Sequence, residues 1–298
     1  MAKLQERLNS LGFSYPLEDS INFVLTTMKE EGDSAAYTHG NSIFLNEKLL
    51  KYAIDKGEEG SAYLETVLAH EIFHVLTRND RDFKENMYNI IGFTLDESEP
   101  DFSDEVREVL VSNPDVESYD SHGVFTIDGT PTEAVIVSYY SKPFEEGVSM
   151  WDSIATGVVP VEKPDRIYTI DEVPDFYDVV GSNTDYVISA EEALADNFSD
   201  AVLYGTDKEY AAPAIIDEML AYMASDIPTD TVTGEHTVKA PSSEEDASED
   251  EAAATERVAR EVIRGMWGDG ADRIHALDAA GYDSKAVQQR VNELMSGS

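Results

Sequence analysis

The sequence predicts an α+β fold for a large N-terminal domain, followed by a small module of three short helices. Three patterns support this prediction: an apolar repeat of helical period over residues 61–77, strand-like segments over residues 123–140, and helical patterns again after residue 189. Because helices and strands fall in separate runs and do not alternate along the chain, the patterns favour α+β over a parallel α/β fold.

The first helix is predicted from Ser61 to Thr77 by apolar residues that recur three and four positions apart. These residues are Leu64, Val67, Leu68, Ile72, Val75 and Leu76. Gly60 before the helix and Asn79-Asp80 after it are residues that favour helix ends. A second helix is predicted over residues 83–91, where apolar residues again share one side.

The centre of the chain has the pattern of a β-hairpin. The segments 123–127 and 134–140 are rich in β-branched and aromatic residues, and Asp128-Gly129 between them favours a tight turn. Two more helices are predicted after the hairpin, one beginning at Ser189 and one from Pro213 to Met223.

Composition excludes several classes of function. The 298 residues carry 21 Lys and Arg against 61 Asp and Glu, a formal net charge of −40, yet 42% of them are hydrophobic. The hydrophobic content is typical of a folded protein, whereas the charge argues against binding to nucleic acid or to anionic lipid. With no Cys in the chain, disulfides and thiolate ligands are excluded, so a transition-metal site has to use His, Asp or Glu.

The N-terminal sequence lacks the apolar region of a signal peptide, and no run of 18 apolar residues occurs. We therefore expect no signal peptide and no membrane insertion, with the protein cytoplasmic when made. The sequence gives no indication of an oligomeric state.

The distribution of charge predicts the domain boundaries. Residues 256–298 hold seven acidic and six basic residues, so −39 of the net charge lies in residues 1–255. Residues 241–252 hold six acidic residues, no basic residue and no large apolar one, a composition typical of disordered linkers. We expect one domain over residues 1–225, an acidic disordered linker over 226–255 and a module over 256–298.

The strongest chemical motif is His70-Glu71-Ile72-Phe73-His74, in the middle of the first predicted helix. Two histidines four residues apart lie about 40° apart around a helix, so both imidazoles can reach one metal ion. Glu71 then lies beside the open coordination position, where it can take a proton from metal-bound water. The motif therefore predicts a catalytic Zn²⁺ site with His70 and His74 as ligands.

A third ligand is expected from the helix that begins at Ser189. Glu192 and Asp196 share the side of this helix opposite its apolar residues, which favours Glu192 as a ligand and Asp196 as the acceptor that fixes a ligand imidazole. Ser189 and Glu192 also have the spacing of a capping box, so a purely structural role for Glu192 is the alternative. Glu191 is interpreted as an ordinary acidic residue of the first helical turn.

These motifs together resemble the zincin metallopeptidases that use a Glu as the third ligand, such as thermolysin-like enzymes. The resemblance lies in HEIFHVLTR and EEALADNF and extends over residues 36–205. It implies a zincin-like domain in which His70, His74 and Glu192 bind zinc, Glu71 is general base and acid, and Asp196 orients a ligand.

Zincins commonly place a Tyr or His donor opposite the general base. Tyr186 is the first choice for this donor and His122 the second, although a packed aromatic ring is the alternative for either. His39, His236 and His275 are interpreted as surface histidines.

The module over residues 256–298 is predicted to form three short helices, punctuated by Gly265, Gly268, Gly270 and Gly281. The shared pattern VAREVIxGxWGxGxDRxxxLxxAGYDxxAVQxxVNEL resembles the Cpl-seven repeat, a cell-wall-binding repeat of phage lysozyme, and implies binding to muropeptides of peptidoglycan. Donors and a stacking surface for such a ligand are available from Arg260, Arg264, Trp267, Arg273 and Tyr282. A core position is the alternative for Trp267 and Tyr282.

The two resemblances predict a zinc metallopeptidase targeted to the bacterial cell wall, as in a phage-type peptidoglycan endopeptidase that acts after release. One alternative is a metalloprotease of protein substrates. Another is a non-catalytic wall-binding or virion protein with a vestigial metal site.

Overall fold

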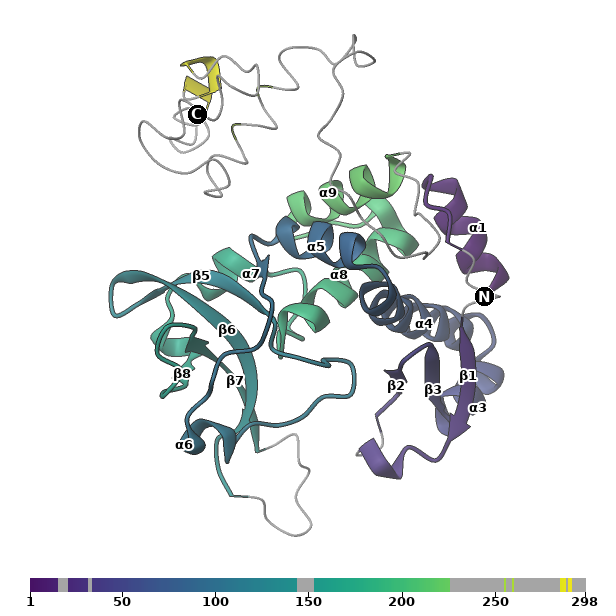
Figure 1. Cartoon of the computed structure of the whole chain (residues 1–298). Helices are drawn as coiled ribbons and strands as arrows, with labels where there is room; N and C mark the ends of the chain where they lie inside the picture. Colours follow the sequence, from purple (N-terminus) through teal and green to yellow (C-terminus); the bar gives the residue numbers. More distant parts are fainter. Residues whose placement is uncertain are drawn as a thin grey trace. The chain divides into compact units, whose positions relative to one another are not determined.

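The computed structural model describes residues 1–15, 21–31, 34–143 and 153–225, and in the C-terminal segment residues 255, 259, 285–287 and 289–290. The chain divides into two compact units, Met1–Asp230 and Thr231–Ser298. Helices and strands of the first unit fall in separate runs, which confirms the predicted α+β class (Figure 1).

The expected linker over residues 226–255 lies outside the described residues except for Thr255. The same holds for the residues to which wall binding was assigned, Arg260, Arg264, Trp267, Arg273 and Tyr282. The linker, the three-helix module and the wall-binding role of these side chains therefore stay predictions.

Helix α4 (Glu58–Asn79) carries the histidine motif and confirms the first predicted helix, which it exceeds at both ends. Its second half is buried on almost all sides, because the apolar stripe faces the core and the motif faces another helix. Gly60 allows α3 (Glu47–Lys56) to pack closely on α4: a Cβ at Gly60 would lie 2.7 Å from Cα of Ala53.

A three-stranded sheet precedes these helices. It consists of β1 (Asn22–Thr26), β2 (Ala36–His39) and β3 (Ser42–Asn46) in the order β1-β3-β2. β1 runs parallel to β3 and β2 antiparallel to it. The outer strand β1 exposes Phe23, Val24 and Leu25, the last with an exposed fraction of 59%. At the other edge, β2 contacts α4, which places this edge next to the histidine motif.

A second, antiparallel sheet contains five strands in chain order. They are β4 (Thr94–Leu95), β5 (Ser121–Ile127), β6 (Thr130–Tyr140), β7 (Ile154–Pro160) and β8 (Tyr168–Thr169). β5 and β6 form the predicted hairpin, and its turn residues Asp128 and Gly129 both have positive φ, 51° and 78°. β6 separates two cores, because Ala134 and Ile136 face the main one and Val135 and Val137 a smaller one.

Helix α8 (Ala190–Tyr204) runs through the main core, and its capping residue Ser189 confirms the predicted start. It packs against α4, α9 and α5. α9 (Pro213–Ala224) and α5 (Arg81–Ile90) confirm the other two predicted helices. The rings of Phe73, Phe83 and Phe198 meet where α4, α5 and α8 cross, with centroids 5.4–6.0 Å apart.

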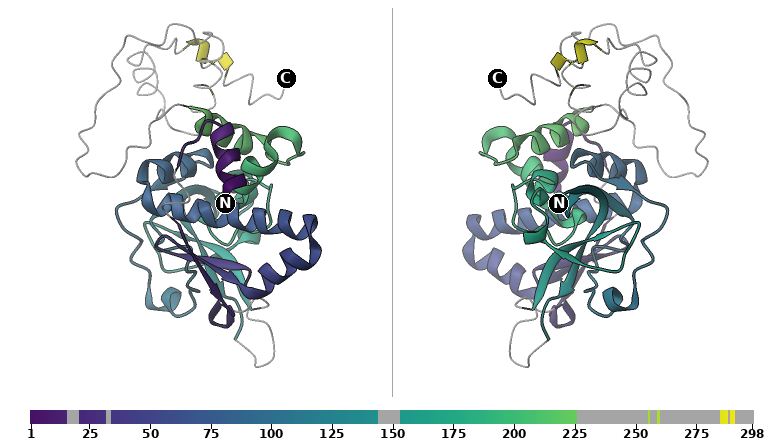
Figure 2. Two further views of the ribbon diagram at one scale, coloured as in Figure 1. Left: turned by 90° about the vertical axis from the view of Figure 1, so that its right-hand side faces the viewer. Right: turned by 90° about the vertical axis from the view of Figure 1, so that its left-hand side faces the viewer.

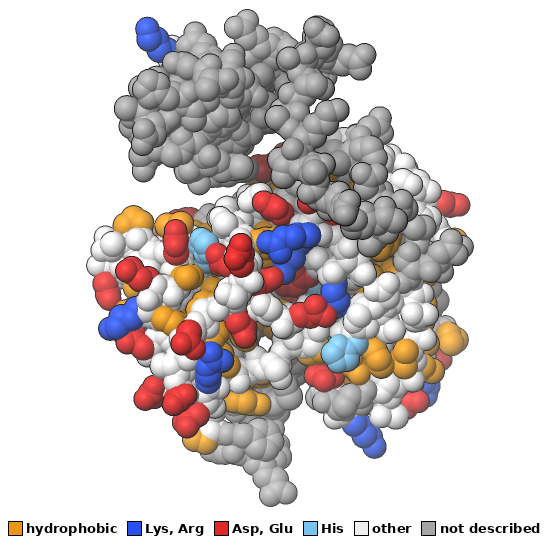
Figure 3. Space-filling model, viewed as in Figure 1, with side chains coloured by type: hydrophobic (Ala, Val, Ile, Leu, Met, Phe, Trp, Pro, Cys, Tyr) orange, Lys and Arg blue, Asp and Glu red, His pale blue; other side chains and the backbone are white. Residues whose placement is uncertain are grey.

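The remaining shorter elements are α1 (Ala2–Ser10), α6 (Asp104–Arg107), α7 (Phe176–Val180) and the 3-10 helices Lys29–Glu31, Ile170–Glu172 and Gly205–Asp207. Figure 2 shows α1 and α9 at one end of the unit. Figure 3 shows acidic side chains spread over one face of the unit, with few basic ones among them. Within the described residues, no helix combines the length and the apolar character needed to span a membrane.

Candidate metal centre

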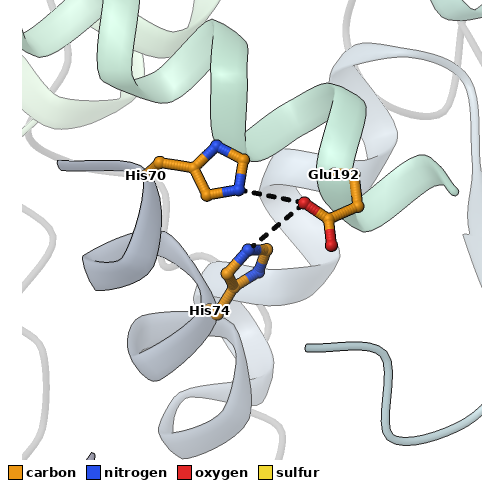
Figure 4. A group of neighbouring side chains, drawn as sticks. All are labelled: His70, His74 and Glu192. Carbon is orange, nitrogen blue, oxygen red and sulfur yellow. Dashed lines mark hydrogen bonds and ion pairs between the residues drawn. The ribbon is translucent and has the colours of Figure 1, made fainter. Parts of the chain in front are cut away.

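The packing of α4 against α8 brings both motif histidines to one carboxylate (Figure 4). His70 and His74 lie one turn apart on α4, and Glu192 comes from the first turn of α8, where its backbone N–H donates to Ser189 Oγ. Oε2 of Glu192 lies 2.9 Å from Nε2 of His70 and 3.5 Å from Nε2 of His74. Ser189 thus caps the helix through the backbone of Glu192, whereas the Glu192 carboxylate faces the histidines and does not complete a capping box.

These three side chains fit a zinc ion. Their ligand atoms all lie within 4.8 Å of one another, and ligand atoms around a tetrahedral Zn²⁺ are about 3.4 Å apart. Nε2 of His74 is buried and has no hydrogen-bond partner among the described residues, although Oε2 of Glu192 lies 3.5 Å from it. A buried nitrogen without a partner is costly in a native fold, and a metal ion at this position would satisfy it. The donor set of two imidazoles and one carboxylate is typical of catalytic zinc.

Each imidazole also contacts a carboxylate through its Nδ1, on the side of the ring away from Glu192. Nδ1 of His70 lies 2.8 Å from Oδ1 of Asp196, which is the contact that the sequence predicted for Asp196. Nδ1 of His74 lies 2.9 Å from Oε1 of Glu191. Because each Nδ1 is engaged, both rings present Nε2 to the same point, as imidazole ligands do when a carboxylate holds the other nitrogen.

Glu191 is one residue whose role sequence reasoning missed. It was interpreted as an ordinary first-turn acid, but its side chain is only 5% exposed. In addition to His74, Glu191 accepts hydrogen bonds from Oγ1 of Thr77 at 2.6 Å and from the hydroxyl of Tyr88 at 2.5 Å. Since these partners come from α4 and α5, no local pattern in the sequence could distinguish Glu191 from a solvated acid.

Glu71 is buried in the same place, with an exposed fraction of 4%, and Oε2 has no hydrogen-bond partner in the part of the chain that the structure describes. Burial and the charge of Asp115 raise the pKa of Glu71 to about 8, against the opposing effect of the two histidines. Glu71, His74 and Asp115 also bring ligand atoms within 4.8 Å of one another. This group shares His74 with the first one, so both groups belong to a single centre.

Protonated histidines balance the negative charge of the carboxylates in the centre. Burial would lower the pKa of His70, but hydrogen bonds to Asp196 and Glu192 outweigh this effect and raise it to about 10. The pKa of His74 is also raised, because Asp115, Glu192 and Glu191 outweigh its burial. The two histidines in turn hold the pKa of Glu192 low against its burial. A cation that binds here would therefore displace protons from imidazolium groups.

Tyr186, the first choice for an oxyanion donor, lies at the rim of the site, and its ring centroid is 6.2 Å from that of His70. Its pKa is raised by burial and by the charge of Glu192, so its hydroxyl stays protonated at neutral pH.

The second choice, His122, lies on β5 with Nδ1 2.8 Å from Asp96. Of the predicted surface histidines, His39 is exposed, whereas His236 and His275 lie outside the described residues.

A cleft of about 550 Å³ lies beside the centre. Ala36 and Tyr37 of β2 line one side, and Ile188 and residues 111–115 line others. Asn113, Asp115 and Tyr186 are the lining residues nearest to the centre, whereas the lining does not include the two histidines, Glu71 or Glu192. The cleft therefore adjoins the centre through Asn113, Asp115 and Tyr186.

Comparison with known proteins bears on the C-terminal segment. Residues 256–295 match the CW_7 repeat. The chain resembles a cell-wall-binding repeat there, as its sequence predicted. The lysozyme of Streptococcus phage Cp-7 is 57% identical over 37 residues, and this match covers 12% of the chain and 11% of the lysozyme. No solved structure matches the chain significantly. The comparisons thus support the wall-binding repeat and leave the first unit to be interpreted from its own geometry.

Proposed function

We propose that the protein is a zinc metallopeptidase that its C-terminal repeat targets to the bacterial cell wall. The convergence of His70 Nε2, His74 Nε2 and Glu192 Oε2, with the buried Glu71 beside them, is the observation that carries the proposal. A site of two imidazoles, one ligand carboxylate and one free carboxylate is suited to hydrolysis by an activated water.

A bound zinc ion would supply Lewis acidity, which lowers the pKa of water and polarises a carbonyl group. A cation at the centre would lower the pKa of Glu71 and keep it ionised. The Glu71 carboxylate takes the proton from the attacking water as the oxygen–carbon bond forms, and passes it to the amine nitrogen as the carbon–nitrogen bond breaks. We assign to the hydroxyl of Tyr186 the donation to the carbonyl oxygen as its negative charge develops, which the nearness of its ring to that of His70 supports. Asp196 and Glu191 hold the two imidazoles in position throughout.

We propose the peptides of peptidoglycan as the substrate, because the CW_7 repeat and the match to a phage lysozyme both support attachment to cell wall. Such a protein fits a phage-type lytic endopeptidase. Cleavage of the glycan is less consistent with this site, since glycosidases place paired carboxylates on both sides of an acetal. The main alternative is a protease of protein substrates that uses the repeat only for placement.

The test measures metal content by mass spectrometry and the release of amines from purified peptidoglycan, for the wild type, Glu192→Ala and the control Glu58→Ala. Glu58 is an exposed first-turn residue of α4, so its loss leaves the site intact. We expect one zinc per chain and amine release in the wild type and the control, and neither in Glu192→Ala. Zinc with cleavage of casein but not of cell wall would favour the protease alternative. Absence of zinc in all three would overturn the catalytic proposal and leave a wall-binding protein.

A further inference from the structure

The two oxygens of the Glu192 carboxylate have different surroundings. Oε2 faces the two histidines, whereas Oε1 accepts a hydrogen bond of 2.5 Å from Nδ2 of Asn113. Asn113 comes from neither α4 nor α8 but from the segment between α6 and β5. The bond fixes the rotation of the carboxylate about its last torsion angle, and thereby keeps Oε2 directed at the histidines.

The orientation of the Asn113 amide is determined by its other end. Oδ1 of Asn113 accepts the backbone N–H of Asp115 at 2.9 Å, so the amide oxygen is engaged there and the NH₂ group has to face Glu192. Within the same turn the backbone N–H of Val116 donates to the carbonyl of Asn113 at 3.1 Å. An amide does not ionise, so this donor is available to the carboxylate at every pH.

Arg78 ties this turn to the helix that carries the histidines. It lies one turn beyond His74 on α4, and its side chain is only 9% exposed. Its guanidinium donates to the carbonyls of Pro114 and Asp115, each at 3.4 Å, and to Thr38 Oγ1 at 2.8 Å. Its Nε lies 2.8 Å from a carboxylate oxygen of Glu117.

A second connection holds the turn on the side of β2. Oδ1 of Asp115 accepts from the backbone N–H of Thr38 at 2.7 Å and from its hydroxyl at 2.6 Å. The turn is therefore bonded both to α4 and to the sheet edge, which leaves Asn113 little freedom to move away from Glu192.

We propose that Asn113 is a positioning residue for the metal ligand Glu192, and that Arg78 holds Asn113 in place. The inference rests on the proposed metal centre and adds a member to it from outside the two motifs. Each of the three ligands then has a partner that fixes it: Asp196 for His70, Glu191 for His74 and Asn113 for Glu192. Outer partners of this kind strengthen metal binding by orienting the ligands before the ion arrives.

The test compares Asn113→Ala with Asn46→Ala in the full chain. Asn46 is a matched control, because its amide also donates to an oxygen, Ser34 O at 2.8 Å, and accepts a backbone N–H, that of Lys48 at 3.0 Å. We expect Asn113→Ala to weaken binding of Zn²⁺ and Co²⁺ by about 10–100-fold in competition with a chromophoric chelator. Asn46→Ala lowers stability alone and leaves these affinities within about twofold of the wild type. The visible spectrum of the Co²⁺ protein should change only in Asn113→Ala, because Glu192 alters its coordination there.

The role of Arg78 is tested by a double-variant cycle with Arg78→Lys. If Arg78 acts through Asn113, Arg78→Lys weakens Co²⁺ binding in the wild-type background and has little further effect in Asn113→Ala. Additive losses would overturn this part of the inference. Wild-type metal affinity and an unchanged Co²⁺ spectrum in Asn113→Ala would overturn the role of Asn113 while the metal centre stands. Failure of the wild type to bind either metal would overturn the centre and this inference together.

Discussion

Glu191 and His74 form a buried pair in which a carboxylate oxygen lies 2.9 Å from Nδ1 of the imidazole. The pair matches the one between Asp196 and His70, so the centre has two histidines with equivalent support. Adjacent residues of α8 thus have different tasks, because Glu192 faces Nε2 of the histidines and Glu191 faces Nδ1 of His74 from the other side.

Replacement of Glu191 by Gln should weaken metal binding without removing a ligand. Gln has the shape of Glu but lacks the negative charge that makes the imidazole of His74 a stronger metal ligand. We therefore expect zinc affinity to fall by about 10–100-fold. Competition with a chelator measures the change. Glu58→Gln, an exposed first-turn residue of α4, is the control and should bind zinc as the wild type does. Equal affinity of both variants would contradict the role of Glu191.

Glu71→Gln should separate chemistry from metal binding. Without a carboxylate to accept and return a proton, the rate of amine release should fall by about 10²–10⁴-fold. The zinc content should stay at one ion per chain, since Glu71 is not among the three proposed ligands. Loss of the metal in Glu71→Gln would indicate instead that Glu71 coordinates the ion.

Zinc binding should release protons, and its affinity should rise with pH. The pKa of His70 is raised to about 10 and that of Glu71 to about 8 in the metal-free site. His70 therefore carries a proton at pH 7 that it has to lose in order to coordinate, and lowering the pH strengthens this competition. Each proton released changes the apparent affinity about tenfold per pH unit. Calorimetry in two buffers with different ionisation enthalpies gives the number of protons, which we expect to exceed one at pH 7. A value of zero would mean that the histidines are already neutral.

Gly60→Ala should destabilise the domain although Ala is the better helix former. The new Cβ would lie 2.6 Å from the carbonyl oxygen of Tyr52 and 2.7 Å from Cα of Ala53, both backbone atoms of α3. The steric cost of about 1–3 kcal/mol exceeds the gain of about 1 kcal/mol in helix propensity. Urea unfolding measures the difference, with Ser61→Ala at the neighbouring exposed position as control. Increased stability of Gly60→Ala would show that α3 moves away at little cost.

Trp267→Ala should weaken attachment to cell wall while leaving the metal centre unaffected. Whether Trp267 stacks on the ligand or packs in the module core, we expect binding to purified peptidoglycan to weaken by about 30-fold or more, the effect of losing about 2 kcal/mol of binding free energy. Co-sedimentation with cell wall measures binding, and zinc content serves as the control. Unchanged sedimentation would place the wall-binding surface elsewhere in the chain.

Local patterns in the sequence were sufficient for the elements that position the centre. α4, the β5–β6 hairpin and the start of α8 all follow from periodicity, turn residues and capping residues. The strands before α4 were not predicted, and β1 in particular is exposed along most of its length and shows no alternation. Asn113 could not be found either, since an Asn before a Pro is typical of a turn and its contact with Glu192 depends on how the chain returns to α8.

The outer strand β1 also affects the tendency of the protein to associate with other copies of itself. Phe23, Val24 and Leu25 form an apolar edge with which no other strand of the described residues pairs on its outer side. Such edges favour association between molecules, and natural proteins counter it with charge. A net charge of −40 supplies a strong mutual repulsion, but salt screens it beyond about 8 Å at physiological ionic strength. Two effects therefore oppose each other: the apolar edge of β1 attracts other molecules at short range, and the net charge repels them at longer range. We expect added salt to weaken the repulsion and thereby to favour aggregation.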